Sequence, residues 1–143
     1  MHISGLLEQK GSFVATIHSD ATIIEVTREL HKQRVGALVI SKDGRSIDGI
    51  VSERDIVGAI GQFGPAILDS PVKMIMTDVI RTCSPDDEVD SLAAIMTENR
   101  IRHVPVSDNG VLVGIVSIGD IVKTRLDQLE QDRDALEQYI TAR

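Results

Sequence analysis

Apolar residues along the chain fall into two kinds of pattern, which alternate. A spacing of three to four residues predicts a helix, and a short unbroken run bounded by turn residues predicts a buried strand. In the first half these patterns predict a helical or extended lead-in at 1–12, a strand at 13–17, a helix at 22–33 capped by Ser19 or Asp20, strands at 37–40 and 47–51, and a helix that Ser52 opens.

The second half repeats this order, which indicates a tandem duplication. The repeat offset is 66 residues up to Gly44 and 65 after it, and it pairs Thr16 with Thr82, Arg34 with Arg100, Ser52 with Ser117 and Asp55 with Asp120. We expect one unit at 8–66, a second at 74–130, and an extension at 131–143.

The second copy has clearer turn signals than the first. A cap, a proline and two acids at 84–87 predict the start of a helix that runs to about Asn99. A strand at 79–83 precedes it, and a hairpin of 104–106 with 111–116 follows around Asp108-Asn109-Gly110. Pro105 lacks an N–H donor, so its strand should lie at a sheet edge or be partly unpaired there.

Each copy ends its last strand with Ser-x-x-Asp, at Ser52 to Asp55 and at Ser117 to Asp120. The simple interpretation is a capping box, in which the hydroxyl and the acid satisfy N–H groups of the first helical turn. The same junction also offers N–H groups to a phosphate and a carboxylate to a ribose diol.

The final segment predicts one long helix from Ile118 to Ala142. Its apolar residues Val122, Leu126, Leu129, Leu136 and Ile140 follow a heptad, and Arg133 occupies the remaining apolar position. This stripe continues past the point where the first copy ends. Self-association would cover it, and packing back on the same chain is the alternative.

Composition narrows the class of protein. The net charge of −7 argues against nucleic-acid binding, which needs clustered Lys and Arg. The single cysteine, Cys83, cannot form an internal disulfide, and this favours the cytoplasm. The N-terminal residues do not resemble a signal peptide, and no apolar run reaches membrane-spanning length, so we expect no membrane partner.

Catalytic and metal-binding patterns are missing from the sequence. The four histidines lack metal-ligand spacing, Cys83 reads as a small core residue, and no nucleophile is paired with a base. The chain is therefore not expected to be an enzyme. The basic segment Arg100 to Pro105 remains open to two interpretations, a phosphate contact or a solvated turn at the strand entry.

A duplicated β-α-β-β-α unit with Gly-x-x-Ser-x-x-Asp before its last helix resembles the cystathionine-β-synthase (CBS) domain, over about residues 8–130. The resemblance implies an α+β fold in which the two repeats pack with pseudo-twofold symmetry. It further implies two clefts for adenosine-containing ligands, namely AMP, ADP, ATP, NAD(H) or S-adenosylmethionine, and homodimers with two pairs in a disc.

Carried over by residue, the resemblance implies that Asp120 binds the ribose hydroxyls and Ser117 faces the phosphate in one cleft. Losing Asp120 should then cost more affinity than losing Ser117. The backbone of one segment would frame the adenine or phosphate, namely Ile101, Arg102, His103, Val104 and Pro105. The first copy's lead-in would form the opposite wall, with Lys10, Gly11, Val14 and Thr16.

The other cleft would use Ser52, Arg54 and Asp55. Here the first copy departs from the pattern, because Val39 stands where Pro105 does and Gly36-Ala37 replace Arg102-His103. Arg54 would restore positive charge, and Met76, Thr77 and Ile80 would form the wall.

Three functions follow as hypotheses. The first is a non-enzymatic sensor in which an adenosine ligand changes the packing of the repeats and what a protein effector sees. The second is a structural dimerisation module with vestigial clefts. The third is an enzyme such as a nucleotide hydrolase, which needs a metal or base that the sequence does not supply.

Overall fold

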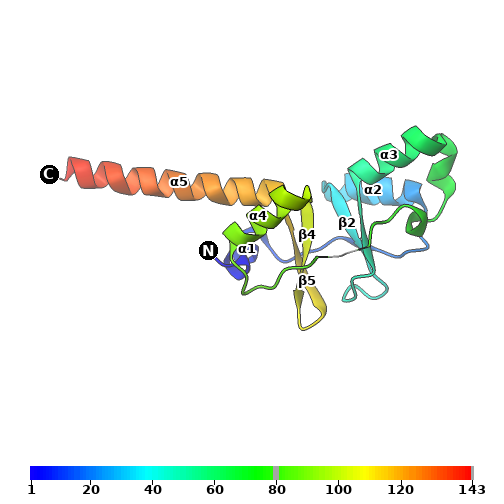
Figure 1. The fold of residues 1–143 in the computed structure, drawn as a ribbon, viewed down its shortest axis with the longest axis horizontal. Coiled ribbons are helices and arrows are strands. Elements are labelled where there is room, and N and C mark those ends of the chain that lie inside the picture. Colours follow the sequence, from blue (N-terminus) through cyan, green and yellow to red (C-terminus); the bar gives the residue numbers. More distant parts are fainter. Residues whose placement is uncertain (79–80, 143) are drawn as a thin grey trace.

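The computed structural model describes residues 1–78 and 81–142. It has an α+β fold of two repeats set side by side, from which the C-terminal helix projects as a long arm (Figure 1). The helices and strands of the first half are α1 (Ile3–Lys10), β1 (Thr16–Ile17), α2 (Ile23–Gln33), β2 (Ala37–Ile40), β3 (Gly49–Ser52), α3 (Glu53–Phe63) and the 3₁₀ turns η1 (Pro65–Asp69) and η2 (Val72–Met74).

The second half contains α4 (Val89–Asn99), β4 (His103–Asp108), β5 (Val111–Ser117) and α5 (Ile118–Thr141). In the first repeat, β1 runs parallel to β2, and β2 runs antiparallel to β3. In the second, β4 and β5 are antiparallel and Cys83 forms an isolated parallel bridge with Val106, in the position that β1 holds in the first repeat. The two halves therefore share one topology, as the duplication predicted.

Each repeat has its own hydrophobic core. The first core lies between α2, α3 and the three-stranded sheet, and Ile23, Leu38 and Val51 are fully buried in it. The second lies between α4, α5 and the β4–β5 hairpin, and includes Val104 and Met96. These cores use branched aliphatic side chains because the chain has only 2% aromatic residues.

The N-terminal helix α1 packs into the second core, far from it in sequence. Ile3, Leu6 and Leu7 are buried there. The Ile3 and Ser4 amides donate to the Asp87 and Pro85 carbonyls, both at 2.9 Å. A Cβ at Gly114 would lie 2.8 Å from Leu7 Cδ2, so α1 rests directly on β5 at a position where only glycine leaves room.

The segment between the repeats is attached to the first sheet. Ile50 and Thr77 exchange two backbone hydrogen bonds of 2.9 Å, and the Leu112 amide donates to the Arg45 carbonyl at 2.9 Å. Gly49 allows this close approach, because a Cβ there would lie 2.9 Å from Met76 Sδ and 3.1 Å from the Thr77 carbonyl. These contacts connect one repeat to the other beside β3.

Several predicted boundaries are wrong. Thr22, not Ser19 or Asp20, caps α2. The Thr22 hydroxyl accepts a hydrogen bond from the Glu25 amide, and the Glu25 carboxylate accepts one from the Thr22 amide. The helix α4 begins at Val89, not near Pro85, because Ser84 to Asp87 close a turn of their own. The strand expected at 13–17 shortens to Thr16–Ile17.

Other predictions are confirmed. Ser52 and Ser117 begin α3 and α5, and α5 is a single long helix. Pro105 does not lie at a free edge: β4 pairs with β5 on one side, and on the other the Cys83 amide donates to the Pro105 carbonyl at 3.0 Å. Cys83 is buried, and burial raises the pKa of its thiol to about 12, so it behaves as a small core residue. Within the described ranges, no helix is both long and apolar enough to cross a bilayer.

Candidate functional site

The two strand-to-helix junctions are both reciprocal capping boxes. At the start of α3, the Ser52 amide donates to Asp55 Oδ2 at 2.9 Å, and the Asp55 amide donates to Ser52 Oγ at 3.3 Å. At the start of α5, the corresponding distances for Ser117 and Asp120 are 2.8 and 3.1 Å. Each carboxylate is thus held at the positive end of a helix dipole.

The second junction is already bound by a lysine of the same chain. Lys10 Nζ, at the end of α1, donates to Asp120 Oδ2 and to the Ile115 carbonyl, both at 2.6 Å. Burial acts to raise the pKa of Asp120, but the Lys10 ammonium and the Ser117 groups outweigh it and hold that pKa below its ordinary value. The carboxylate is therefore ionised and satisfied without any ligand.

The first junction has no such partner. In the described part of the chain, no lysine or arginine forms an ion pair with Asp55, whose Oδ2 accepts only from the amide and hydroxyl of Ser52. Its other oxygen, Oδ1, makes no hydrogen bond with any described group. The two junctions are alike in backbone geometry, but only the Asp55 carboxylate is available to bind a ligand.

A hollow of about 260 Å³ opens at the first junction and takes its walls from both repeats, lined by Gly36, Ile50, Ser52, Glu53, Arg54, Asp55, Thr77, Arg100, Ile101, Arg102 and His103. A second hollow of about 290 Å³ shares four of these residues and is also lined by Asp78, Arg81, Asn99 and Pro105. We call these two adjoining hollows together the first cleft.

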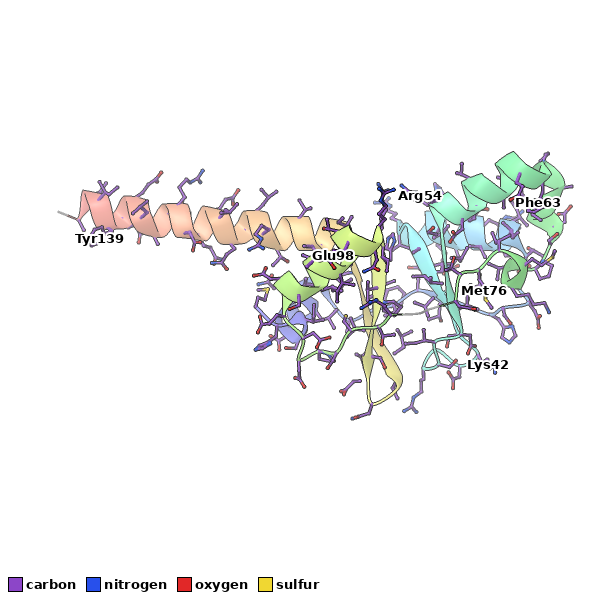
Figure 2. All side chains as sticks on the ribbon, in the orientation of Figure 1. Lys42, Arg54, Phe63, Met76, Glu98 and Tyr139 are labelled. Atoms are coloured by element: carbon purple, nitrogen blue, oxygen red, sulfur yellow. The ribbon has the colours of Figure 1, made fainter. Side chains whose placement is uncertain are left out.

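Positive charge slightly exceeds negative charge in the first cleft. Arg54, Arg100 and Arg102 stand against the carboxylates of Glu53 and Asp55. Figure 2 shows Arg54 projecting from the start of α3 into the gap between the repeats. Arg100 ends α4 in the left-handed conformation, with φ of 53°, so its side chain leaves the helix axis and reaches the cleft. With Arg81 and Asp78, the first cleft holds four guanidinium groups and three carboxylates, a small positive excess that suits an anionic ligand that also carries hydroxyls.

His103 lies between the two junctions. It pairs with Ser117 in the β4–β5 register, and a Cβ at Gly36 would lie 3.4 Å from its Nε2. Burial lowers the pKa of His103, the Lys10 and Arg102 charges lower it further, and Asp120 and Glu53 oppose them. The ring is therefore neutral at pH 7 and touches both repeats.

Stability should consequently fall in mild acid through His103. A depressed folded-state pKa gives a contribution that is complete above the ordinary value of about 6.5 and is lost as the pH falls through the lower folded value. We expect urea unfolding to give a lower free energy near pH 5 than near pH 7.5, and His103→Gln to reduce that difference. An unchanged difference in the variant would contradict the assignment.

The structure assigns the expected site residues to the two junctions differently from the resemblance. Ile101, Arg102 and His103, expected with Asp120, line the first cleft with Ser52, Arg54 and Asp55, together with Gly36 and Thr77. Pro105 joins them in its deeper part. Four other expected residues do not line the first cleft: Ala37 and Thr16 pair within the first sheet, Met76 packs on the first core, and Val104 is buried in the second. Ile80 lies outside the described residues.

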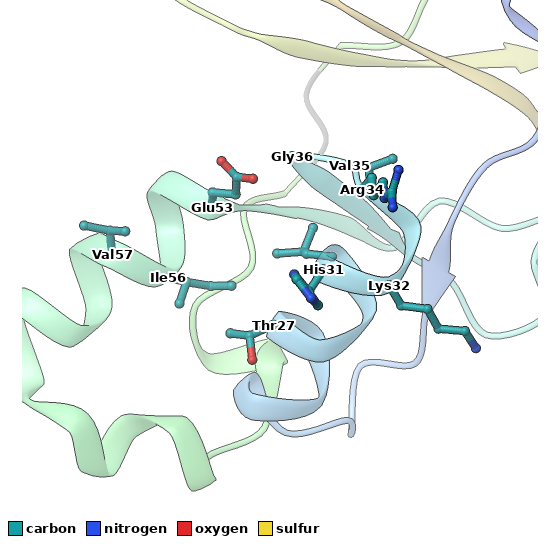
Figure 3. A pocket seen from close by; sticks show the side chains of 10 residues that line it. Thr27, His31, Lys32, Arg34, Val35, Gly36, Glu53, Ile56 and Val57 are labelled. Carbon is teal, nitrogen blue, oxygen red and sulfur yellow. The ribbon is translucent and has the colours of Figure 1, made fainter.

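A hollow of about 570 Å³ lies beside Asp120, between α1 and α5, and Lys10 lines it with Lys123 and Thr124. Ser117, Gly11 and Val14 do not line it. Acidic residues continue along it to Asp134, which makes it a poor match for a phosphate. A larger hollow, of about 760 Å³, lies elsewhere, between α2 and α3, where Thr27 and His31 face Ile56 and Val57 (Figure 3).

Sequence reasoning named Arg100 only within the basic segment Arg100 to Pro105, and it missed five other cleft residues: Ile50, Glu53, Asp78, Arg81 and Asn99. Arg100 carried a usable signal, because a basic residue directly after a helix and before a strand lies where the left-handed C-cap turns the chain. Arg81 and Asn99 carried none. Among residues 1–78 and 81–142, no group of three or more acidic, histidine or cysteine side chains is arranged to hold a metal ion.

Comparison with known families defines the class of protein. The CBS domain model matches residues 12–62 and, a second time, residues 72–127. The chain therefore belongs to the CBS-domain family and carries the domain as a tandem pair. These matched ranges cover the strands, α2, α4, nearly all of α3 and both capping junctions, and they leave out α1 and the second half of α5.

Individual relatives agree with this membership. The chain is 33% identical over 126 residues to a mitochondrial CBS domain-containing protein of Arabidopsis thaliana; the match covers 85% of this chain and 61% of the relative, so the chain spans about three fifths of that protein. A crystal structure of a CBS-domain containing protein from Agrobacterium tumefaciens is 41% identical, covers 87% of this chain and 99% of its own, and has a TM-score of 0.84.

A further solved structure contains a ligand. It is a CBS domain protein from Pyrobaculum aerophilum complexed with AMP, 37% identical, with 84% of this chain and 89% of that chain covered and a TM-score of 0.73.

Proposed function

We propose that this chain is a non-enzymatic regulatory module that binds an adenosine-containing ligand between its two repeats. The ligand is AMP, ADP, ATP, NAD(H) or S-adenosylmethionine, and we place it in the first cleft. The protein acts in the cytoplasm as a homodimer and passes the ligand signal to a protein effector. Binding can change the packing of the repeats only by its preference for one arrangement over another.

The first cleft carries this proposal because it combines, from both repeats, the groups that an adenosine phosphate needs. Asp55 offers a free carboxylate oxygen to the ribose diol. Ile50, Ile101 and Pro105 supply apolar surface for a purine, and the arginines supply charge for phosphate. The AMP complex of the Pyrobaculum aerophilum relative supports the class of ligand.

Calorimetric titration of the purified protein with AMP, ADP, ATP, NADH and S-adenosylmethionine tests the proposal. We expect saturable binding of at least one of them, and a melting temperature that rises with its concentration, since a ligand that binds only the folded state stabilises it. Mass spectrometry of small molecules that co-purify would identify the ligand directly. The proposal fails if none of the five gives heat or a thermal shift at millimolar concentration.

A structural dimerisation module with vestigial clefts is the second candidate. The apolar stripe of α5 favours it, because Val122, Leu126, Leu129, Leu136 and Ile140 are each more than half exposed. The Lys10–Asp120 pair also favours it, since that junction is satisfied without a ligand. A melting temperature that does not change with any of the five adenosine-containing ligands would favour this second candidate.

A further inference from the structure

The helix α5 presents an apolar stripe that the rest of the chain does not cover. Its first turns pack against α1 and α4 and bury Ile121, and the remainder projects away from both repeats (Figure 1). Val122, Leu126, Leu129, Leu136 and Ile140 are between 53 and 59% exposed. We call these five residues, with Arg133, the α5 stripe.

The α5 stripe follows the heptad of a two-stranded coiled coil. Successive steps of four and three residues place Val122, Leu129 and Leu136 at d positions, and Leu126, Arg133 and Ile140 at a positions. In a monomer these apolar side chains would stay exposed to water on a projecting helix. The regular alternation of a and d positions is the pattern that a second helix of the same kind would bury.

We propose that two copies of this chain pair through α5 in an antiparallel coiled coil whose twofold axis passes beside Gln131. This inference rests on the proposed self-association and specifies its surface, orientation and register. In this register Val122 of each copy faces Ile140 of the other, Leu126 faces Leu136, and Leu129 faces Arg133. All six positions of the stripe are used, and α5 overlaps its partner from Ile121 to Thr141.

The charges that flank the α5 stripe favour this orientation. In the antiparallel register Lys123 of each copy faces Glu137 of the other, which gives two attractive pairs. Glu130 and Asp132 each meet their own copy near the axis, where they repel. The two Arg133 guanidinium groups lie beside these acids, although each also lies 3.5 Å from Asp134 Oδ1 of its own chain.

A parallel pairing is less favourable. It would place Arg133 against Arg133 in the apolar seam and Asp132 against Glu137 at its edge. Its one attractive pair would join Arg125 to Glu130. Arg125, however, is already held within its own chain, where its guanidinium lies 2.8 Å from Asp90 Oδ1. The antiparallel arrangement therefore has the better charge match.

Disulfide trapping distinguishes the two orientations. In the antiparallel register the variant V122C/I140C places Cys thiols of the two copies opposite each other, at a spacing that a disulfide can bridge. A parallel pair would also cross-link this double variant, so the single variants decide the orientation. The single variants V122C and I140C place like thiols together only in a parallel pair. The wild-type protein is the control for the one native cysteine, Cys83, which is buried.

We expect mild oxidation to convert most of the double variant to a covalent dimer of twice 15.6 kDa, and to leave both single variants and the wild type uncross-linked. Cross-linking of the single variants would overturn the antiparallel orientation. A noncovalent dimer that forms no cross-link in any variant would overturn α5 as the interface and leave self-association intact. A monomeric mass by light scattering would refute the proposed self-association itself.

Discussion

Replacing Leu6 with alanine is expected to lower the free energy of unfolding by about 2–5 kcal/mol, the usual cost of emptying a fully packed leucine site. Leu6 is only 2% exposed and lies in the second core. Its helix is held there by backbone hydrogen bonds to the turn before α4 and by direct contact between Leu7 and Gly114. Denaturation in urea, followed by circular dichroism, measures the loss.

The matched control is Gln9→Ala on the same helix. Gln9 is exposed, so its removal should change stability by no more than about 0.5 kcal/mol. If Leu6→Ala and Gln9→Ala behaved alike, α1 would not be docked in the second core. The contrast between them therefore reports on the tertiary contact and not on helix propensity.

Replacing Asp55 with asparagine is expected to weaken binding of an adenosine phosphate by about tenfold to a hundredfold. Two hydrogen bonds from ribose hydroxyls to a carboxylate lose their charge assistance, at roughly 1 kcal/mol or more each, and 1.4 kcal/mol is a factor of ten. Asparagine can still accept from the Ser52 amide, so the start of α3 is retained. Calorimetric titration gives the affinity.

Asp120→Asn and Asp69→Asn are the comparison variants. Asp120 is engaged by Lys10, so its loss should alter affinity by less than about threefold. Asp69 is exposed in η1, away from the cleft, and should have no effect. If Asp120→Asn abolished binding while Asp55→Asn did not, the ligand would lie at the junction of Ser117 and Asp120, where the resemblance implied one of its two clefts.

Much of the fold could be predicted because the chain states its pattern twice. Ser52 and Ser117 begin helices through local hydrogen bonds, which a four-residue string specifies. The long helix α5 follows from its uninterrupted heptad. The false start at Ser84-Pro85 shows the limit of local signals, since the same residues also close a turn that binds the α1 backbone.

The candidate site was less predictable, because it depends on contacts between residues far apart in sequence. No local pattern indicates that Lys10 reaches Asp120, 110 residues away. Nor does one indicate that Arg100 and Arg102 face Asp55, a carboxylate of the other repeat. The junctions looked equivalent in sequence, and the docking of α1 makes them different.

The position of α1 also has a consequence for synthesis on the ribosome. The first core is complete once η2 has emerged, and it can form while translation continues. The apolar face of α1 emerges first but finds its site only when β5 and the first turn of α5 have been made. Until then Ile3, Leu6 and Leu7 remain available to chaperones. Docking of α1 closes the long stretch of chain between α1 and β5, which makes it a late step in folding.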